Sequence, residues 1–319
     1  GCQNNNRGFS MRRILLLLAS LLLPAASAAA DKALFDEIAR GQEAVAGLQR
    51  HEATIDGLKV FYLDNGRREA THTILMVHGF GDSSLSWTHF ARRFRDHDFR
   101  IVIPDLPGFG QSERRPDADY RFAAQARRLH LLMQQLGIAG FHVAGNSMGG
   151  GIAAEMALQQ GERIRTLTLI DAAGVHYRPT DLDRSLLAGR NLLVVKTPAD
   201  FEALLEFVMV QRPPMPRPVL DYLAARAVRD SPLHERIFRD ALFDDMNFLL
   251  PGLGAIKAPT LVLWGEKDRV LHPDNAQIFD RYIADSRVVI MPGVGHAPMV
   301  EAPHEASALV VDFINGAKP

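Results

Sequence analysis

A serine held in a glycine-framed turn places the strongest constraint on how this chain can fold. A short apolar run, 141–144, leads into Gly145-Asn146-Ser147-Met148-Gly149, and a helical pattern of small residues follows. This order of strand, sharp turn and helix directs the serine hydroxyl out of the fold. The two glycines let strand and helix approach without a clash between Cβ atoms. The pattern predicts that Ser147 is a nucleophile on a strained turn; the alternative is a serine with only a structural role.

Apolar runs and helical patterns alternate on both sides of this turn. Continuous apolar runs are typical of parallel strands that are covered on both faces, and they predict buried strands at 73–77, 100–105, 166–171, 260–265 and 287–292. Helical patterns lie between them, at 83–97 and 122–136. We therefore expect an α/β fold with a mostly parallel central sheet flanked by helices.

The strand rhythm stops after residue 175 and resumes at residue 260. Residues 176–259 are helical in pattern, rich in Leu, Phe, Met and Arg, and interrupted by prolines between 213 and 218. Such an insertion predicts a helical cap over the ends of the strands, placed after the sixth strand. The expected division is a core of 31–175 and 260–319, a cap of 176–259, and an N-terminal segment of 1–30.

The N-terminal segment has the pattern of a secretory signal peptide. Met11-Arg12-Arg13 precedes an apolar run, 14–24, and the small residues of 25–30 offer a cleavage site. The apolar run is shorter than the roughly 20 residues of a membrane-spanning helix. We expect export to the periplasm or cell surface, and the alternative is an uncleaved membrane anchor. The single cysteine, Cys2, precedes the segment, so cleavage would leave a chain without disulfides.

Two further elements are expected before the first buried strand. Residues 31–50 predict an amphipathic helix on the outside of the core. Residues 58–63 predict a strand that ends in a turn at 64–67, as at the edge of a hairpin.

A histidine and glycine pair follows the first buried strand. His78-Gly79-Phe80-Gly81 stands directly after 73–77, where a fold of this type supplies a backbone N–H for an oxyanion. The second such donor is the N–H at the start of the helix that follows the serine. We therefore expect the backbone N–H groups of Phe80 and Met148 to form an oxyanion hole. A plain glycine turn is the alternative interpretation of this segment.

Two late strands end in residues that would activate a serine. Asp268 follows the strand 260–265, and His296 follows the strand 287–292. A serine hydroxyl needs an adjacent base, and the base works best when a carboxylate fixes its tautomer. The order Ser147, Asp268, His296 is the chain order that this type of fold uses. The acid is the open point, because Asp171 and Glu266 lie at comparable strand ends. A serine, a base, an acid and two backbone donors suit acyl transfer to water.

Several other classes of function are disfavoured. The net charge is −1, with no long basic run, which argues against nucleic acid as a partner. The twelve histidines form no H-E-x-x-H spacing, so no metal is expected. Gly108 and Gly110 lack the further residues of a phosphate-binding loop. We expect no cofactor, and the sequence gives no indication of oligomeric state.

The motifs together resemble the α/β-hydrolase superfamily across nearly all of the chain after residue 30. They are His78-Gly79-Phe80-Gly81, Asp105-Leu106-Pro107-Gly108-Phe109-Gly110-Gln111-Ser112, Gly145-Asn146-Ser147-Met148-Gly149-Gly150, Trp264-Gly265-Glu266-Lys267-Asp268 and Gly295-His296. Segments 207–214 and 294–301 are similar to bacterial lipases related to monoacylglycerol lipases. The resemblance implies carboxylic ester hydrolysis with Ser147 as nucleophile, Asp268 as acid, His296 as base, and Phe80 and Met148 as oxyanion donors.

The expected substrate is an acylglycerol or a medium-chain lipid ester, with transient contact to a lipid surface. Apolar side chains of the cap, Phe207 and Met209 among them, would line an acyl pocket, and Asn146 beside the serine would also contact the substrate. A carbon–carbon bond hydrolase of ring-fission products is the alternative enzyme. Those enzymes usually carry H-G-x-G-P-G, whereas Asp82 and Ser83 follow Gly81 in this chain. A non-catalytic binding protein would lack a member of the triad, and none is missing.

Overall fold

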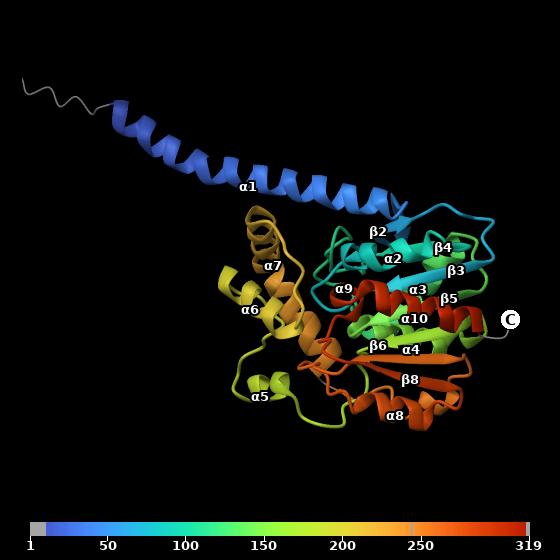
Figure 1. Ribbon diagram of the computed structural model, residues 1–319. Helices are drawn as coiled ribbons and strands as arrows, with labels where there is room; N and C mark the ends of the chain where they lie inside the picture. The colour runs from blue at the N-terminus through green and yellow to red at the C-terminus, as the bar shows by residue number, and fades with distance from the viewer. Residues whose placement is uncertain (1–10, 244, 317–319) are drawn as a thin grey trace, which may run out of the picture.

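The computed structural model describes the backbone of residues 11–243 and 245–316, and the side chains of these residues from Ser27 on. Figure 1 shows an α/β body with a long N-terminal helix, α1 (Met11–Val45), that extends well beyond it. Among the described residues, no helix is both long and apolar enough to cross a membrane.

A single eight-stranded sheet organises the body, in the order β1-β2-β4-β3-β5-β6-β7-β8. From β4 to β8 every neighbouring pair is parallel, and β2 pairs antiparallel with both β1 and β4. The mostly parallel sheet is therefore confirmed. The strands are β1 (Gln49–Ile55), β2 (Leu58–Asp64), β3 (His72–Val77), β4 (Phe99–Pro104), β5 (Phe141–Asn146), β6 (Ile164–Ile170), β7 (Thr260–Gly265) and β8 (Ser286–Met291).

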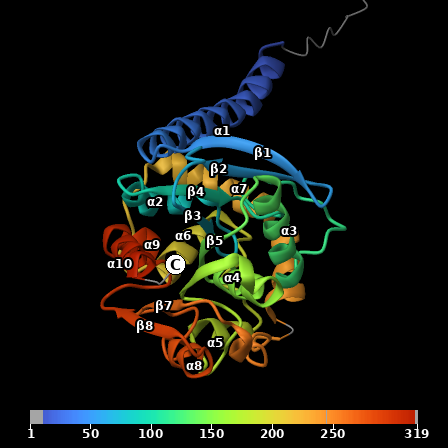
Figure 2. The ribbon, with the colours of Figure 1, turned by 90° about the vertical axis from the view of Figure 1, so that its right-hand side faces the viewer.

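Helices cover both faces of this sheet, which is why its central strands β5, β6 and β7 are almost entirely buried. Figure 2 shows α2 (Thr88–Phe94) and α10 (Pro303–Gly316) on one side, and α3 (Phe122–Gln135) and α4 (Met148–Gln159) on the other. Each side has its own buried cluster: Phe90 and Val310 belong to one, Leu129 and Ile152 to the other. Helix α8 (Asn275–Tyr282) adds Phe279 to the second cluster.

The chain between β6 and β7 is helical, as the pattern of residues 176–259 predicted. It contains α5 (Asp181–Leu187), α6 (Pro198–Val208), α7 (Arg217–Ile237) and a π-helical turn, η3 (Phe238–Phe243). Thr197 caps α6 by accepting a hydrogen bond from the Asp200 N–H. Figure 1 shows these helices gathered at one end of the sheet. We keep the name cap for residues 176–259.

The N-terminal region differs from the sequence prediction in two ways. The predicted helix 31–50 is the end of α1, which stops at Val45 because Gly47 takes a φ of 72° and the Leu48 N–H bonds to the Glu43 carbonyl at 2.9 Å. The hairpin lies before residues 58–63 rather than after them. Asp56 (φ 52°) and Gly57 (φ 74°) turn β1 into β2, as Asp-Gly pairs do in tight hairpins.

The predicted cleavage region at 25–30 lies within α1. Cys2 and the other residues before Met11 lie outside the described residues. Removal of residues 1–30 stays a prediction.

Candidate active site

Ser147 sits at the strained turn between β5 and α4. Its φ of 54° and ψ of −120° place a non-glycine residue at positive φ, which costs on the order of 1–3 kcal/mol and persists only where the surroundings enforce it. They do so here through the backbone. The Ser147 N–H donates to the Ile170 carbonyl at 3.0 Å, and its carbonyl accepts from the N–H groups of Gly151 and Ala173 at 3.1 and 2.9 Å. Ser147 is half-buried between fully buried neighbours.

The glycines that frame the serine are required by close packing. A Cβ on Gly145 would collide with the backbone of Gly149, and a Cβ on Gly149 would collide with the carbonyl oxygens of Val77 and His78. The start of α4 therefore lies directly against the end of β3. This contact brings the predicted oxyanion loop beside the serine: a Cβ on Gly79 would lie 3.2 Å from that of Ser147.

His78 shapes this loop and takes no part in a triad. Its Nε2 accepts from the Leu106 N–H at 2.9 Å, so the ring proton is on Nδ1, which donates to the Gly79 carbonyl at 2.7 Å. That hydrogen bond fixes the orientation of the Gly79 carbonyl. No acceptor for the N–H of Phe80 or of Met148 is found among the described residues. The two predicted oxyanion donors thus stand ready for a ligand, although their role stays a prediction.

The structure brings the predicted base and acid together. His296 Nδ1 and Asp268 Oδ2 are 2.8 Å apart, and both side chains are buried. The other oxygen, Asp268 Oδ1, accepts from the N–H groups of Val270 and Leu271 at 2.8 and 3.0 Å. The Asp268 carboxyl group therefore accepts three hydrogen bonds. With its proton on Nδ1, His296 presents a free lone pair on Nε2.

Among the described residues, neither of the alternative acids forms a hydrogen bond with the His296 ring. Glu266 is exposed and accepts from the Gly293 N–H at 3.0 Å. Asp171 is fully buried behind the pair, and one of its carboxyl oxygens lies within 4.8 Å of ligand atoms on both Asp268 and His296. Burial, and then the neighbouring Asp268, raise the pKa of Asp171 well above its usual range. The three groups are close enough to ligate a cation, but His296 Nδ1 is already engaged with Asp268.

Asn146 joins the serine turn to the histidine loop. Its side-chain amide donates to the His296 carbonyl at 3.0 Å and to the Ile170 carbonyl at 3.2 Å. These bonds fix the His296 backbone next to the residue that precedes Ser147. Within the described residues no hydrogen bond joins Ser147 to the His296 ring; in free enzymes this bond is often long and tightens with substrate. The contacts give Asn146 a supporting position, and its predicted substrate contact stays a prediction.

The cap touches the oxyanion loop through a cluster of aromatic rings. The Phe80 ring packs against Phe109 at 5.6 Å and against the cap residues His234 and Phe238 at 5.6 and 5.7 Å between ring centres. Burial lowers the pKa of His234 to about 4, so the ring is neutral near pH 7. Its Nε2 lies 3.3 Å from the Gly108 carbonyl, to which it donates.

The cap also touches the histidine loop. The His296 N–H donates to the carbonyl of Val208, which lies between the predicted substrate residues Phe207 and Met209. Phe207 is buried with the guanidinium of Arg269 over its ring at 5.0 Å, and Met209 packs against the core. Both predicted residues are therefore placed beside the histidine loop, and contact with substrate stays a prediction.

Glu301, for which the sequence predicted no role, fastens this junction. It lies at the end of α9 (Pro298–Glu301) and is buried. Oε2 accepts from the N–H groups of Val210 and Gln211 in the cap at 2.8 and 3.0 Å. Oε1 accepts from those of Gly295 and Ala297, on either side of His296, at 3.1 and 3.2 Å. One carboxylate thus binds both the cap and the loop that carries His296.

We expect Glu301→Gln to lower the free energy of unfolding by about 3 kcal/mol, because an amide nitrogen in place of either oxygen faces two buried N–H donors. Urea denaturation measures this loss, and ester hydrolysis should fall with it as His296 loses its support. Glu305→Gln is the matched control, since Glu305 is exposed at the start of α10. Equal stability of the two variants would contradict the role of Glu301.

Sequence reasoning missed Glu301 and His234 for different reasons. Glu301 belongs to segment 294–301, which is similar to bacterial lipases. The sequence therefore marked the segment, but it could not show the four backbone N–H groups that Glu301 binds. No sequence signal marked His234, because its contacts depend on how α7 lies over Phe80.

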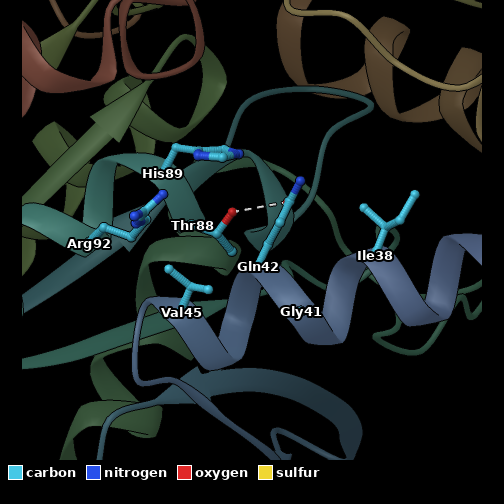
Figure 3. Close-up of a pocket in the computed structure, with 7 residues that line it drawn as sticks. All are labelled: Ile38, Gly41, Gln42, Val45, Thr88, His89 and Arg92. Atoms are coloured by element: carbon cyan, nitrogen blue, oxygen red, sulfur yellow. Dashed lines mark hydrogen bonds between the residues drawn. The ribbon is translucent and has the colours of Figure 1, made fainter.

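A separate cavity of about 210 Å³ lies between α1 and α2. Figure 3 shows Gln42 reaching across to Thr88, whose hydroxyl is 3.3 Å from the Gln42 side-chain oxygen. The lining residues belong neither to the serine turn nor to the loops of Asp268 and His296: they are Ile38, Gly41, Gln42, Val45, Thr88, His89 and Arg92. The cavity therefore takes no part in the candidate active site.

A family model described as alpha/beta hydrolase fold matches residues 72–303. The chain belongs to the α/β-hydrolase family. The match covers β3 to the start of α10, and so includes the serine turn, the oxyanion loop and the loops of Asp268 and His296. The predicted family is confirmed.

Relatives within the α/β-hydrolase family are named as lipases. The chain is 35% identical to Lipase 1 of Psychrobacter immobilis over 254 residues, which is 79% of each chain. It is 28% identical to the monoacylglycerol lipase abhd6-A of Xenopus laevis over 282 residues, or 84% of this chain and 83% of the relative.

Solved structures extend the comparison. A crystal structure described as a membrane phospholipase A and bacterial virulence factor matches with a TM-score of 0.88 and 39% identity, covering 96% of this chain and 99% of that one. A meta-cleavage product hydrolase of Pseudomonas fluorescens matches with a TM-score of 0.70 and 22% identity, over 84% of this chain and 98% of the other. The second likeness shows the fold alone.

Proposed function

We propose that the protein is a lipase or esterase that hydrolyses carboxylic esters of lipids through Ser147, His296 and Asp268. The observation that carries the proposal is the buried 2.8 Å hydrogen bond from His296 to Asp268, in a loop that Asn146 fastens to the serine turn. This pairing leaves His296 Nε2 as a base at the edge of the sheet where Ser147 stands. The lipase names of the relatives agree with it.

The reaction follows from this arrangement. Ser147 Oγ attacks the ester carbonyl carbon while His296 Nε2 takes the hydroxyl proton. The N–H groups of Phe80 and Met148 bind the negative oxygen of the tetrahedral intermediate. The carbon–oxygen bond to the alcohol then breaks, and His296 returns its proton to the leaving oxygen. A water molecule attacks the acyl-enzyme by the same steps and releases the acid.

A lipid chain fits the surroundings of the serine. The cap lies over the oxyanion loop through His234 and Phe238 and over the histidine loop through Val208. An acyl chain entering beside these residues gains about 0.8 kcal/mol for each CH₂ group that it buries. We propose acylglycerols or medium-chain esters as substrates, with Phe207 and Met209 facing the acyl chain. A phospholipid is a substrate of the same class, in keeping with the membrane phospholipase A structure.

We expect kcat/KM on p-nitrophenyl esters to rise from acetate towards medium chains, by about four-fold for each CH₂ group that becomes buried. Monoacylglycerols should be hydrolysed as well. An ester series of increasing chain length measures both effects. Maximal activity on acetate with none on acylglycerols would contradict a lipid substrate. Faster turnover of a ring-fission dienone than of any ester would favour carbon–carbon cleavage instead.

Export of the protein is a further part of the proposal. It is supported by Met11-Arg12-Arg13 and the apolar run that follows. Expression of the full chain, followed by fractionation and mass determination, tests it. A mature form that begins near residue 31 in the periplasmic or secreted fraction would support export, and an intact chain in the cytosol would contradict it.

A further inference from the structure

We propose that Asp171 is a positioning residue that stays protonated and donates a hydrogen bond to Asp268, so that the two carboxyl groups share one proton behind His296. The inference deepens the proposed function, because it rests on the roles given to Asp268 and His296. It assigns a purpose to a buried carboxyl group that the reaction itself does not use.

The hydrogen bonds decide which of the two carboxyl groups carries the proton. Asp268 accepts from three donors, the N–H groups of Val270 and Leu271 and the ring of His296. Asp171 accepts from one, the Gly265 N–H at 3.0 Å onto Oδ1. Its Oδ2 is buried and finds no donor among the described residues. An unpaired buried oxygen is costly, and a proton on Oδ2 turns it into a donor towards the carboxylate of Asp268.

Electrostatics lead to the same assignment. Two adjacent buried carboxyl groups cannot both be ionised, and the one with fewer donors keeps the proton. Burial and the nearby Asp268 raise the pKa of Asp171, and Glu301 adds to the effect from α9. The titratable groups that face Asp171 are therefore Asp268 from the loop after β7, His296 from the loop after β8, and Glu301. Glu301 is held by its own four N–H donors.

The backbone fixes Asp171 in this place. The residue follows β6 with a φ of 45°, and its N–H donates to the Leu263 carbonyl of β7 at 3.0 Å. Aspartate tolerates this left-handed conformation better than most residues do. The side chain is thus held between the ends of β6 and β7, at the point where the loop that bears Asp268 begins. Its donated proton is the fourth hydrogen bond on the Asp268 carboxylate, and holds that carboxylate towards His296.

Kinetics of two variants test the proposal. In Asp171→Asn the amide keeps both a donor and an acceptor, so kcat/KM should stay within about three-fold of the wild type, with an unchanged pH profile. In Asp171→Ala the donor is lost. Then kcat should fall by about 10-fold or more with little change in KM, and the acid limb should move to higher pH as the less stabilised carboxylate attracts the proton of His296.

An ionised Asp171 would give a different result. Asp171→Asn would then remove a negative charge beside His296, and the acid limb would move to lower pH. That outcome, or full activity of Asp171→Ala with an unchanged pH profile, would overturn the proposal.

Two measurements need no turnover, and so remain informative if the protein is not an ester hydrolase. A protonated Asp171 gives the infrared band of a neutral carboxyl group at pH 7, which Asp171→Asn removes. At any pH above the ordinary pKa of aspartate, about 3.9, folding of the wild type must also take up a proton, whereas folding of the variant need not. Because the pKa of Asp171 is higher in the folded than in the unfolded protein, the free energy of unfolding of the wild type falls as pH rises. The denaturation midpoint of Asp171→Asn should therefore increase steadily relative to that of the wild type as pH rises.

The matched control is Asp181→Asn. The pKa of Asp181 is lowered, chiefly by its hydrogen bond with Arg269. The difference in denaturation midpoint between Asp181→Asn and the wild type should therefore be constant above pH 6. A constant difference for Asp171→Asn as well, with no infrared band, would show that Asp171 is ionised. Loss of ester hydrolysis in every assay, with the band present, would contradict the proposed function while leaving the shared proton intact.

Discussion

Ser147→Ala is expected to lower kcat/KM for p-nitrophenyl butyrate by about 10⁴-fold or more. The methyl group of alanine offers no oxygen to attack the ester, so no acyl-enzyme forms. The fold should survive, because the turn is held by backbone bonds from Ser147 to Ile170, Gly151 and Ala173 and none of these uses the hydroxyl. Any activity that remains reflects the oxyanion donors and substrate binding alone.

Ser185→Ala serves as the control for this substitution. Ser185 lies in α5, where its hydroxyl donates to the Arg190 carbonyl, and its loss should leave the rate unchanged. Thermal denaturation of both variants establishes that they are folded. A folded Ser147→Ala variant with more than about 1% of wild-type activity would exclude Ser147 as the nucleophile.

Asp268→Asn is expected to reduce kcat by about 10³ to 10⁴-fold. The asparagine oxygen can still accept from Val270 and Leu271, but its amide then points N–H groups at His296 Nδ1. The ring must move its proton to Nε2 to accept them, and Nε2 can no longer take the proton of Ser147. The loss should therefore appear in kcat, with KM little changed and the fold intact.

This substitution also settles the choice among the three acids that the sequence offered. Glu266→Gln should have almost no effect, because Glu266 is exposed and its side chain interacts with the Gly293 N–H and with Lys267 rather than with His296. A stable Asp268→Asn variant that keeps wild-type activity would show that another carboxyl group orients His296. Asp171 would then be the group to replace next.

Much of the core was predictable because its patterns are local. The continuous apolar runs of β3, β4, β6 and β7 predicted a parallel sheet, and G-x-S-x-G predicted the turn at Ser147. The helical pattern of residues 176–259 also sufficed to predict the cap. Two predictions near the N-terminus were wrong, because the turn signals there are short. Gly47 ends the helix that was predicted to reach residue 50, and the Asp56-Gly57 pair forms the hairpin turn that was predicted at 64–67.

The positions of the candidate site residues were predictable from the sequence, whereas the contacts that hold them in place were not. Strand ends located Asp268 and His296, yet the sequence left Asp171 open as the acid. Its orientation depends on pairing between β6 and β7, which brings the Gly265 N–H to one oxygen and leaves the other without a donor among the described residues. Glu301 and Asn146 act through backbone groups far along the chain, at Val210 and His296. Contacts of that kind leave no periodic pattern in a sequence.

The order in which the strands enter the sheet has a consequence for biosynthesis. β8 is both the last strand in the chain and the outer strand of the sheet, where β7 is its partner, and His296 follows it. Under the proposed triad, Ser147 is therefore made before His296, the proposed base, during translation. A triad of this composition would become complete only once β8 has joined the sheet, so the proposed hydrolysis of lipids would begin after the rest of the sheet is formed.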